Sequence, residues 1–150
     1  MYSDDHAYAE LSAYTLTKGD AGFIHQHVVD AYAVQTAAES DKPIRVAQAL
    51  IGLYLHVECG FDGRQVQRVH QLIANRRPEW PSFALSQDRG PTSVRDVVAH
   101  RPGAGRDQAI EAWVESTWNA CRNVRDSVAS FLSAHGVDPR ERRGSSPRSL

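Results

Sequence analysis

The sequence predicts an all-α protein, a compact helical bundle of about five to six helices with one long C-terminal helix. Its long apolar stretches follow helical spacing and end at glycine or proline, and no clear alternating pattern indicates a strand. A chain of 150 residues with 41% hydrophobic content can bury roughly 70% of its unfolded surface in one core. We therefore expect a single domain over residues 1–137, followed by a disordered polar tail over 138–150.

Four helices are expected in the first half of the chain, over residues 5–16, 21–38, 43–58 and 63–76. Gly19 follows the first of these helices and Gly60 follows the third, which is the usual place of glycine at a helix C-terminus. Asp20 fits the N-cap of the second helix, and Pro43 fits the first turn of the third.

The segment 77–91 holds three prolines and is expected to be an irregular connection between helices. Its apolar residues Trp80, Phe83 and Leu85 can pin it onto the bundle. Because it is long and bounded by prolines, it is a candidate lid over a pocket.

The remaining helices are expected over residues 92–100 and 106–135, the second ending before Gly136. The long helix has the clearest apolar stripe of the chain, made of Ile110, Trp113, Val114, Thr117, Cys121, Val124, Val128, Phe131 and Leu132.

Charge and composition disfavour several classes of protein. The net charge of −1 comes from 17 basic and 18 acidic residues spread along the chain, which indicates neither a nucleic-acid nor an anionic-membrane surface. No signal segment or membrane span is recognised, so a cytoplasmic protein is expected. Cys59 and Cys121 lack metal-binding spacing and are expected to be reduced thiols. The motifs of serine hydrolases, nucleotide hydrolases and nicotinamide enzymes are missing.

The candidate functional site centres on His27 and Asp30, which stand one turn apart in the second helix. His27 lies near the middle of that helix's apolar arc and Asp30 at its edge, whereas His25 points elsewhere. A buried histidine must be hydrogen-bonded, metal-bound or catalytic, and all three interpretations stay open. One is a structural pair, another is a metal site, and the third is a metal-free pair for acid–base catalysis.

The metal hypothesis adds ligands from the next two helices. Glu58 ends the buried stripe of the third helix, and His70 borders the apolar arc of the fourth. His56 faces away from that stripe and is not chosen. His27, Asp30, Glu58 and His70 together would suit zinc, iron or manganese with a position left open for water.

Three further polar residues are candidates for binding a small-molecule substrate. Gln35 shares the buried arc of His27 and needs partners, which a ligand could supply. Tyr14 and Tyr54 carry hydroxyl groups that could reach a bound molecule or donate a proton. Their simpler interpretation is that they are amphipathic core residues.

The chain resembles an uncharacterised bacterial family known only as a domain of unknown function. The resemblance covers nearly the whole chain except the tail, and the segment from Phe23 to Ala33 (FIHQHVVDAYA) is its most specific part. The family has no established activity, so the resemblance implies a single compact domain. Its members often have a histidine where this chain has Thr36, and some begin with a cysteine pair that is absent here. Further matching segments are Tyr14–Leu16, Gly19-Asp20, Lys42–Ile44, Ala49–Glu58, Gly63–Gln67, Trp80-Pro81 and Arg106–Trp113.

Three classes of function follow from these residues. In the first, the protein is a small metal-dependent enzyme that acts on a small molecule. In the second, it is a metal-free cyclase, isomerase or lyase of small-molecule biosynthesis, with His27 and Asp30 moving a proton. In the third, it is a non-catalytic binding or assembly module whose partner is a second copy of the chain.

Overall fold

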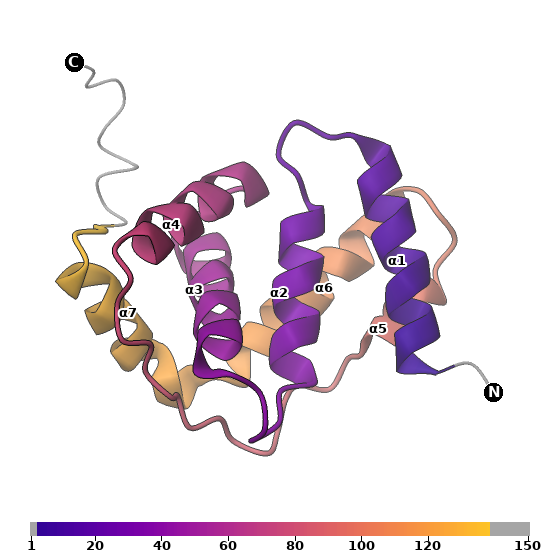
Figure 1. The fold of residues 1–150 in the computed structure, drawn as a ribbon. Coiled ribbons are helices and arrows are strands. Elements are labelled where there is room, and N and C mark those ends of the chain that lie inside the picture. Colours follow the sequence, from indigo (N-terminus) through magenta and orange to yellow (C-terminus); the bar gives the residue numbers. More distant parts are fainter. Residues whose placement is uncertain (1–2, 139–150) are drawn as a thin grey trace.

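The computed structural model describes residues 3–138, which form an all-α fold without strands, as the sequence predicts (Figure 1). The predicted tail lies, except for Asp138, outside the described residues. The helices are α1 (Asp4–Lys18), α2 (His25–Gln35), α3 (Pro43–Cys59), α4 (Gly63–Asn75), α5 (Val94–Val98), α6 (Ala104–Asn119) and α7 (Arg125–Ala134), with a 3-10 turn at Arg122–Val124.

The helix α3 is the centre of the fold. It packs against α2, α4, α6 and α7, and Figure 1 shows it between α2 on one side and α4 and α7 on the other. Pro43 begins the helix, and Gly60 ends it with a left-handed backbone at φ 76°. Because neighbours cover α3 on several sides, residues around its whole circumference are buried: Ala47, Ala49, Leu50, Ile51, Gly52, Leu53, Tyr54 and Leu55.

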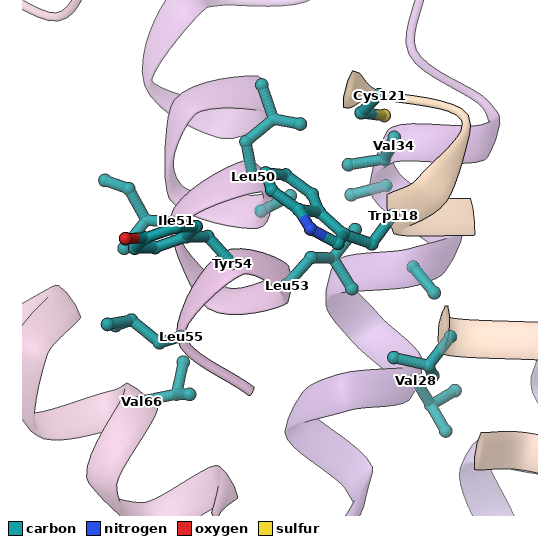
Figure 2. Close-up of a cluster of buried hydrophobic side chains, with 14 of the residues drawn as sticks. Val28, Val34, Leu50, Ile51, Leu53, Tyr54, Leu55, Val66, Trp118 and Cys121 are labelled. Carbon is teal, nitrogen blue, oxygen red and sulfur yellow. The ribbon is translucent and has the colours of Figure 1, made fainter. Parts of the chain in front are cut away.

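The largest side chains of the core gather between α3 and α6. Figure 2 shows Leu50, Leu53 and Tyr54 from α3 around the indole ring of Trp118 from α6. Trp118 is fully buried, and the ring of Tyr54 meets it edge-on with centroids 5.9 Å apart. The burial of large apolar side chains on both helices fixes α6 against α3.

The helix α2 is shorter than the sequence predicts. It starts at His25 and not at Ala21, because Phe23 has a positive φ of 54° that interrupts a helix. Asp20 still stabilises this end of the helix, since its Oδ2 accepts a hydrogen bond of 2.9 Å from the Ile24 backbone N–H. The turn places His27 and Asp30 in the first half of the helix.

The long helix expected over residues 106–135 is divided into α6 and α7. At the division, the Ala120 carbonyl accepts a hydrogen bond from the Ser86 hydroxyl, and the Asn123 amide donates to the Ala84 carbonyl. The predicted apolar stripe faces the core on both sides of the division. Trp113 and Val114 are buried on α6, and Val128 is buried on α7. The bend allows both segments to pack against α3.

The connection 77–91 is attached to the bundle away from the expected site. Arg89 donates to the backbone carbonyls of Val34 and Ala37 at the end of α2, at 2.8 and 3.3 Å. Trp80 contacts the Phe131 ring of α7. These contacts hold the connection at the C-terminal end of α2, so it does not form the expected lid over Asp30.

None of the helices within residues 3–138 combines the length and the apolar character needed to cross a membrane.

Candidate functional site

The side chains of His27 and Asp30 both point into the protein from the same face of α2. His27 is 2% exposed and Asp30 is 3% exposed. Their burial follows from the helical arc on which the sequence places them. The structure gives no hydrogen bond between the imidazole and the carboxyl group. The two side chains therefore have different neighbours.

Asp30 is enclosed between α2 and α3. Its Oδ1 accepts a hydrogen bond of 3.1 Å from the Gln26 side chain, while its buried Oδ2 has no hydrogen-bond partner. The carboxyl group lies directly against the α3 backbone at Gly52, where a Cβ atom would come within 1.8 Å of Oδ2. Burial raises the pKa of Asp30 well above its ordinary value, and the Gln26 hydrogen bond opposes this only in part. Burial therefore favours the neutral, protonated form of the Asp30 carboxyl group.

Asp30 also lines a pocket of about 480 Å³, which we call the Asp30 pocket. Gln48 also lines this pocket, and its Oε1 atom is buried and has no hydrogen-bond partner. The Nε2 atom of His70 donates to the Gln48 backbone carbonyl at 2.7 Å, and burial lowers the pKa of this histidine. The residues that line the pocket include Tyr8, Gln26, Asp30, Arg45, Gln48 and His70.

His27 stacks on His56 of α3, with ring centroids 3.5 Å apart and 16° between the ring planes. The Nδ1 atom of His56 lies 2.8 Å from the Phe61 carbonyl, and its Nε2 lies 2.9 Å from Oε1 of Glu111. A carbonyl and a carboxylate only accept hydrogen bonds, so His56 needs a proton on both nitrogens. Burial alone lowers the pKa of His56, but the bonds to Glu111 and Phe61 outweigh it and raise this pKa.

His27 is the neutral member of this stack. Burial, together with the charge of the adjacent His56, lowers the pKa of His27 to about 4. Its Nδ1 atom is buried and has no hydrogen-bond partner. A protonated His27 would place a second cation directly on a protonated His56 ring, so protonation of one ring opposes protonation of the other.

The four residues expected to bind a metal do not form one cluster. Glu58 accepts hydrogen bonds of 2.7 Å from both Trp118 and Arg125, and His70 bonds to the Gln48 carbonyl. Across residues 3–138, no group of three or more His, Cys, Asp or Glu side chains is placed to hold a metal ion. The geometry that a zinc, iron or manganese centre requires is therefore not formed by His27, Asp30, Glu58 and His70.

The residues expected to bind substrate have partners within the protein. Tyr14 donates to Asp107 of α6 at 2.6 Å, and Tyr54 packs against Trp118 in the core. Gln35 accepts a hydrogen bond of 2.9 Å from the Trp113 indole N–H and donates to the carbonyls of residues 89 and 92. None of the three lines the Asp30 pocket.

Replacement of Gln35 by methionine is expected to destabilise the protein by about 2 kcal/mol, because the buried Trp113 N–H loses its acceptor. The backbone carbonyls of Arg89 and Thr92 also lose their hydrogen bonds from Gln35. Urea unfolding of Gln35→Met beside Gln71→Met measures this effect, since the side chain of Gln71 is exposed and donates to Asn75 on the surface of α4. Equal stabilities of the two variants would contradict a structural role for Gln35.

Sequence reasoning missed the residues that α3 contributes. Gln48, Gly52 and His56 all face α2 or the Asp30 pocket, although a single apolar arc on α3 assigns His56 and Gly52 to the outer side. The available signal was the length of the apolar run 49–55, which is typical of a helix that is buried all round. Gln26 could also have been found, because a Gln–Asp pair four residues apart can hydrogen-bond along a helix.

The fold and the site define a small all-α domain with a buried carboxyl group at the wall of a pocket. The model of a family of unknown function, DUF5946, matches residues 5–122, and the chain belongs to this family. This confirms the resemblance expected from the sequence. No curated protein and no solved structure matches the chain.

Proposed function

We propose that this protein is an enzyme that acts on a small molecule bound in the Asp30 pocket, with the neutral carboxyl group of Asp30 as general acid. The observation that carries the proposal is the state of Asp30. It is 3% exposed, lines a pocket and has an oxygen atom without a partner. A carboxyl group that stays protonated at neutral pH can donate a proton to a reacting group.

The neighbours of Asp30 suit this role. Gln26 holds Oδ1 and so fixes the orientation of the carboxyl group. Gly52 provides the space that the group occupies on α3. Perturbed carboxyl groups that line pockets are typical of active sites, because a free energy cost of this kind is rarely maintained by packing alone.

The other two classes of function have less support. A metal-dependent enzyme needs donors that converge, and the four expected ligands lie apart. A purely structural role for the buried polar groups fits Gln35 and Glu58, whose atoms are paired with Trp113, Trp118 and Arg125. It does not fit Asp30, since a structural carboxyl group is expected to have partners for both oxygen atoms.

The first test is the protonation state of Asp30. In protein labelled with ¹³C-aspartate, we expect the Asp30 carboxyl resonance, assigned by its loss in Asp30→Asn, to remain that of a protonated acid at pH 7. Asp126 supplies an internal reference because its side chain is 96% exposed. An Asp30 resonance that titrates near pH 4, the ordinary value of an aspartate side chain, would overturn the proposal.

The second test is chemical turnover. The protein is incubated with a mixture of cellular metabolites, and mass spectrometry follows which compounds are consumed. We expect at least one compound to be consumed by the wild type and by Asp126→Asn, and its consumption to fall by about 100-fold or more in Asp30→Asn. Equal consumption by Asp30→Asn, or no consumption by the wild type, would contradict the assignment of Asp30 as general acid.

A further inference from the structure

We infer that the protein has a second ligand site, which takes a small organic carboxylate with an apolar body. The site lies between the 77–91 connection and the turn that joins α2 to α3, two segments that run side by side in Figure 1. A pocket of about 460 Å³ is formed there, and we call it the Arg89 pocket. It shares no lining residue with the Asp30 pocket, so the inference does not depend on the proposed function.

Arg89 is a half-buried arginine without an ion pair. Across residues 3–138, two other arginines are buried or half-buried: Arg106 pairs with Glu10 at 3.0 Å, and Arg125 pairs with Glu58 at 2.7 Å. No carboxylate of these described residues forms such a pair with Arg89. A charged side chain that leaves bulk water is normally paired, because the desolvation of an unpaired charge costs free energy. Arg89 is therefore the cation at which an anionic ligand would supply the partner.

The guanidinium group of Arg89 is held in place and has one free nitrogen. Its Nε donates to the Ser86 carbonyl at 2.7 Å, and its Nη1 donates to the carbonyls of Val34 and Ala37 at 2.8 and 3.3 Å. These bonds leave both N–H groups of Nη2. Within residues 3–138, Nη2 has no acceptor, and it is not buried, so a ligand can reach it. A carboxylate at Nη2 would meet a donor that is already oriented, which favours a charge-assisted hydrogen bond.

The rest of the pocket suits an apolar body. Val46 of α3 and the side chains of Phe83 and Leu85 from the connection line the pocket and are partly exposed. An apolar group that covers these side chains removes their surface from water, which favours binding. Apolar walls with a few polar groups are typical of small-molecule sites. The segment that the sequence marks as a candidate lid thus lines this pocket and not the one at Asp30.

Two acidic residues also line the Arg89 pocket, and neither is paired with Arg89. Asp41 accepts a hydrogen bond of 2.8 Å from the Ala38 backbone N–H and pairs with Arg45 at 3.0 Å, so its charge is already balanced. Glu39 is exposed, and water and salt screen its repulsion of an anion in the pocket. The charge that a ligand would complement is therefore that of Arg89.

Three probes with the same ring and a similar length separate the classes of charge: phenylacetate, phenylacetamide and phenethylammonium. Each is titrated at pH 7 into ¹⁵N-labelled full-length protein, and binding is followed through the backbone resonances of Ala38 and Ala84, which line the pocket. We expect phenylacetate to bind at least about tenfold more tightly than the amide or the ammonium ion, because it alone forms a charge-assisted hydrogen bond with Arg89.

Two variants assign this preference to the Arg89 pocket. Arg89→Gln removes the charge, so phenylacetate should bind at least about tenfold more weakly, whereas Arg68→Gln at an exposed arginine of α4 should bind it as the wild type does. Because Arg89 also attaches the connection to α2, Ala38→Phe tests the same pocket without changing Arg89. Ala38 is exposed and lines the pocket, so a phenyl group there should obstruct it and abolish binding. Ala112→Phe, at an exposed alanine of α6, is the matched control.

Equal or tighter binding of the amide or the ammonium ion would overturn the inference, and so would binding of none of the three probes. Wild-type affinity for phenylacetate in Ala38→Phe, or in folded Arg89→Gln, would overturn it as well. If Arg89→Gln does not fold, the probe series and Ala38→Phe decide the result. Glu39→Gln should bind phenylacetate at least as tightly as the wild type, and weaker binding would contradict the assignment of Arg89 as the charge of the site.

Discussion

Replacement of Gly52 by alanine is expected to destabilise the protein by about 3 kcal/mol. The added Cβ would lie 1.8 Å from Oδ2 and 2.7 Å from Cγ of Asp30, and 3.2 Å from a methyl group of Val66. The two atoms of Asp30 cannot stay where they are at these distances. Since Asp30 is buried between α2 and α3, the carboxyl group can move only if the two helices separate or the side chain leaves its site.

A double-mutant cycle measures how much of this effect passes through Asp30. In an Asp30→Ala background, Gly52→Ala should cost much less, with a coupling free energy of about 1–3 kcal/mol by urea unfolding. Gly105→Ala in α6 is the matched control, because its nearest neighbouring atom would be 4.0 Å from the new Cβ. In that helix the same substitution is expected to stabilise by about 0.5–1 kcal/mol. The same cost of Gly52→Ala in both backgrounds would contradict the placement of Asp30.

The sequence predicts the helical elements where local signals decide the structure. Asp62 caps α4 through a capping box with Gln65, and the C-terminal glycines of α1 and α3 adopt positive φ. The division between α6 and α7 has no such local signal. It depends on contacts from Ser86 and Asn123 to distant backbone carbonyls, and periodicity within one segment does not contain those contacts.

The same contrast between local signals and packing of distant segments explains which parts of the candidate site could be predicted. The burial of His27 and Asp30 could be predicted because α2 has one interior face, and both residues lie on it. The residues that α3 contributes could not be predicted in this way. The position of apolar residues around a helix assigns one interior face to it, whereas α3 is covered on several sides. The metal hypothesis depended on Glu58 and His70 facing His27, and that requires knowledge of how three helices pack.

The His27–His56 stack is expected to make the protein sensitive to acid. The pKa of His27 is about 4 in the folded state and about 6.5 in the unfolded chain, so protons bind the unfolded chain more readily. The contribution of His27 to stability is therefore complete above pH 6.5, and it is lost as the pH falls toward 4. The difference of about 2.5 pKa units corresponds to about 3 kcal/mol.

The pKa shift of His56 has the opposite effect on how stability depends on pH. Its pKa is raised in the folded state, so its contribution is complete below pH 6.5 and is lost as the pH rises through its folded pKa. Asp30 also has a raised pKa, and its cost to the folded state grows as the pH rises above its unfolded value near 4. Of these three residues, only His27 makes the folded protein less stable as the pH falls. A variant at His27 therefore isolates this loss of stability in acid.

Urea unfolding of the wild type and His27→Gln between pH 7 and pH 4 measures this contribution. At neutral pH the variant is expected to be less stable, because glutamine does not stack on the charged His56 ring. As the pH falls, the stability of the wild type should decrease by about 3 kcal/mol more than that of the variant. His100→Gln, at an exposed histidine, should follow the wild type at every pH. A constant difference in the free energy of unfolding between wild type and His27→Gln from pH 7 to pH 4 would contradict a lowered pKa of His27 in the folded protein.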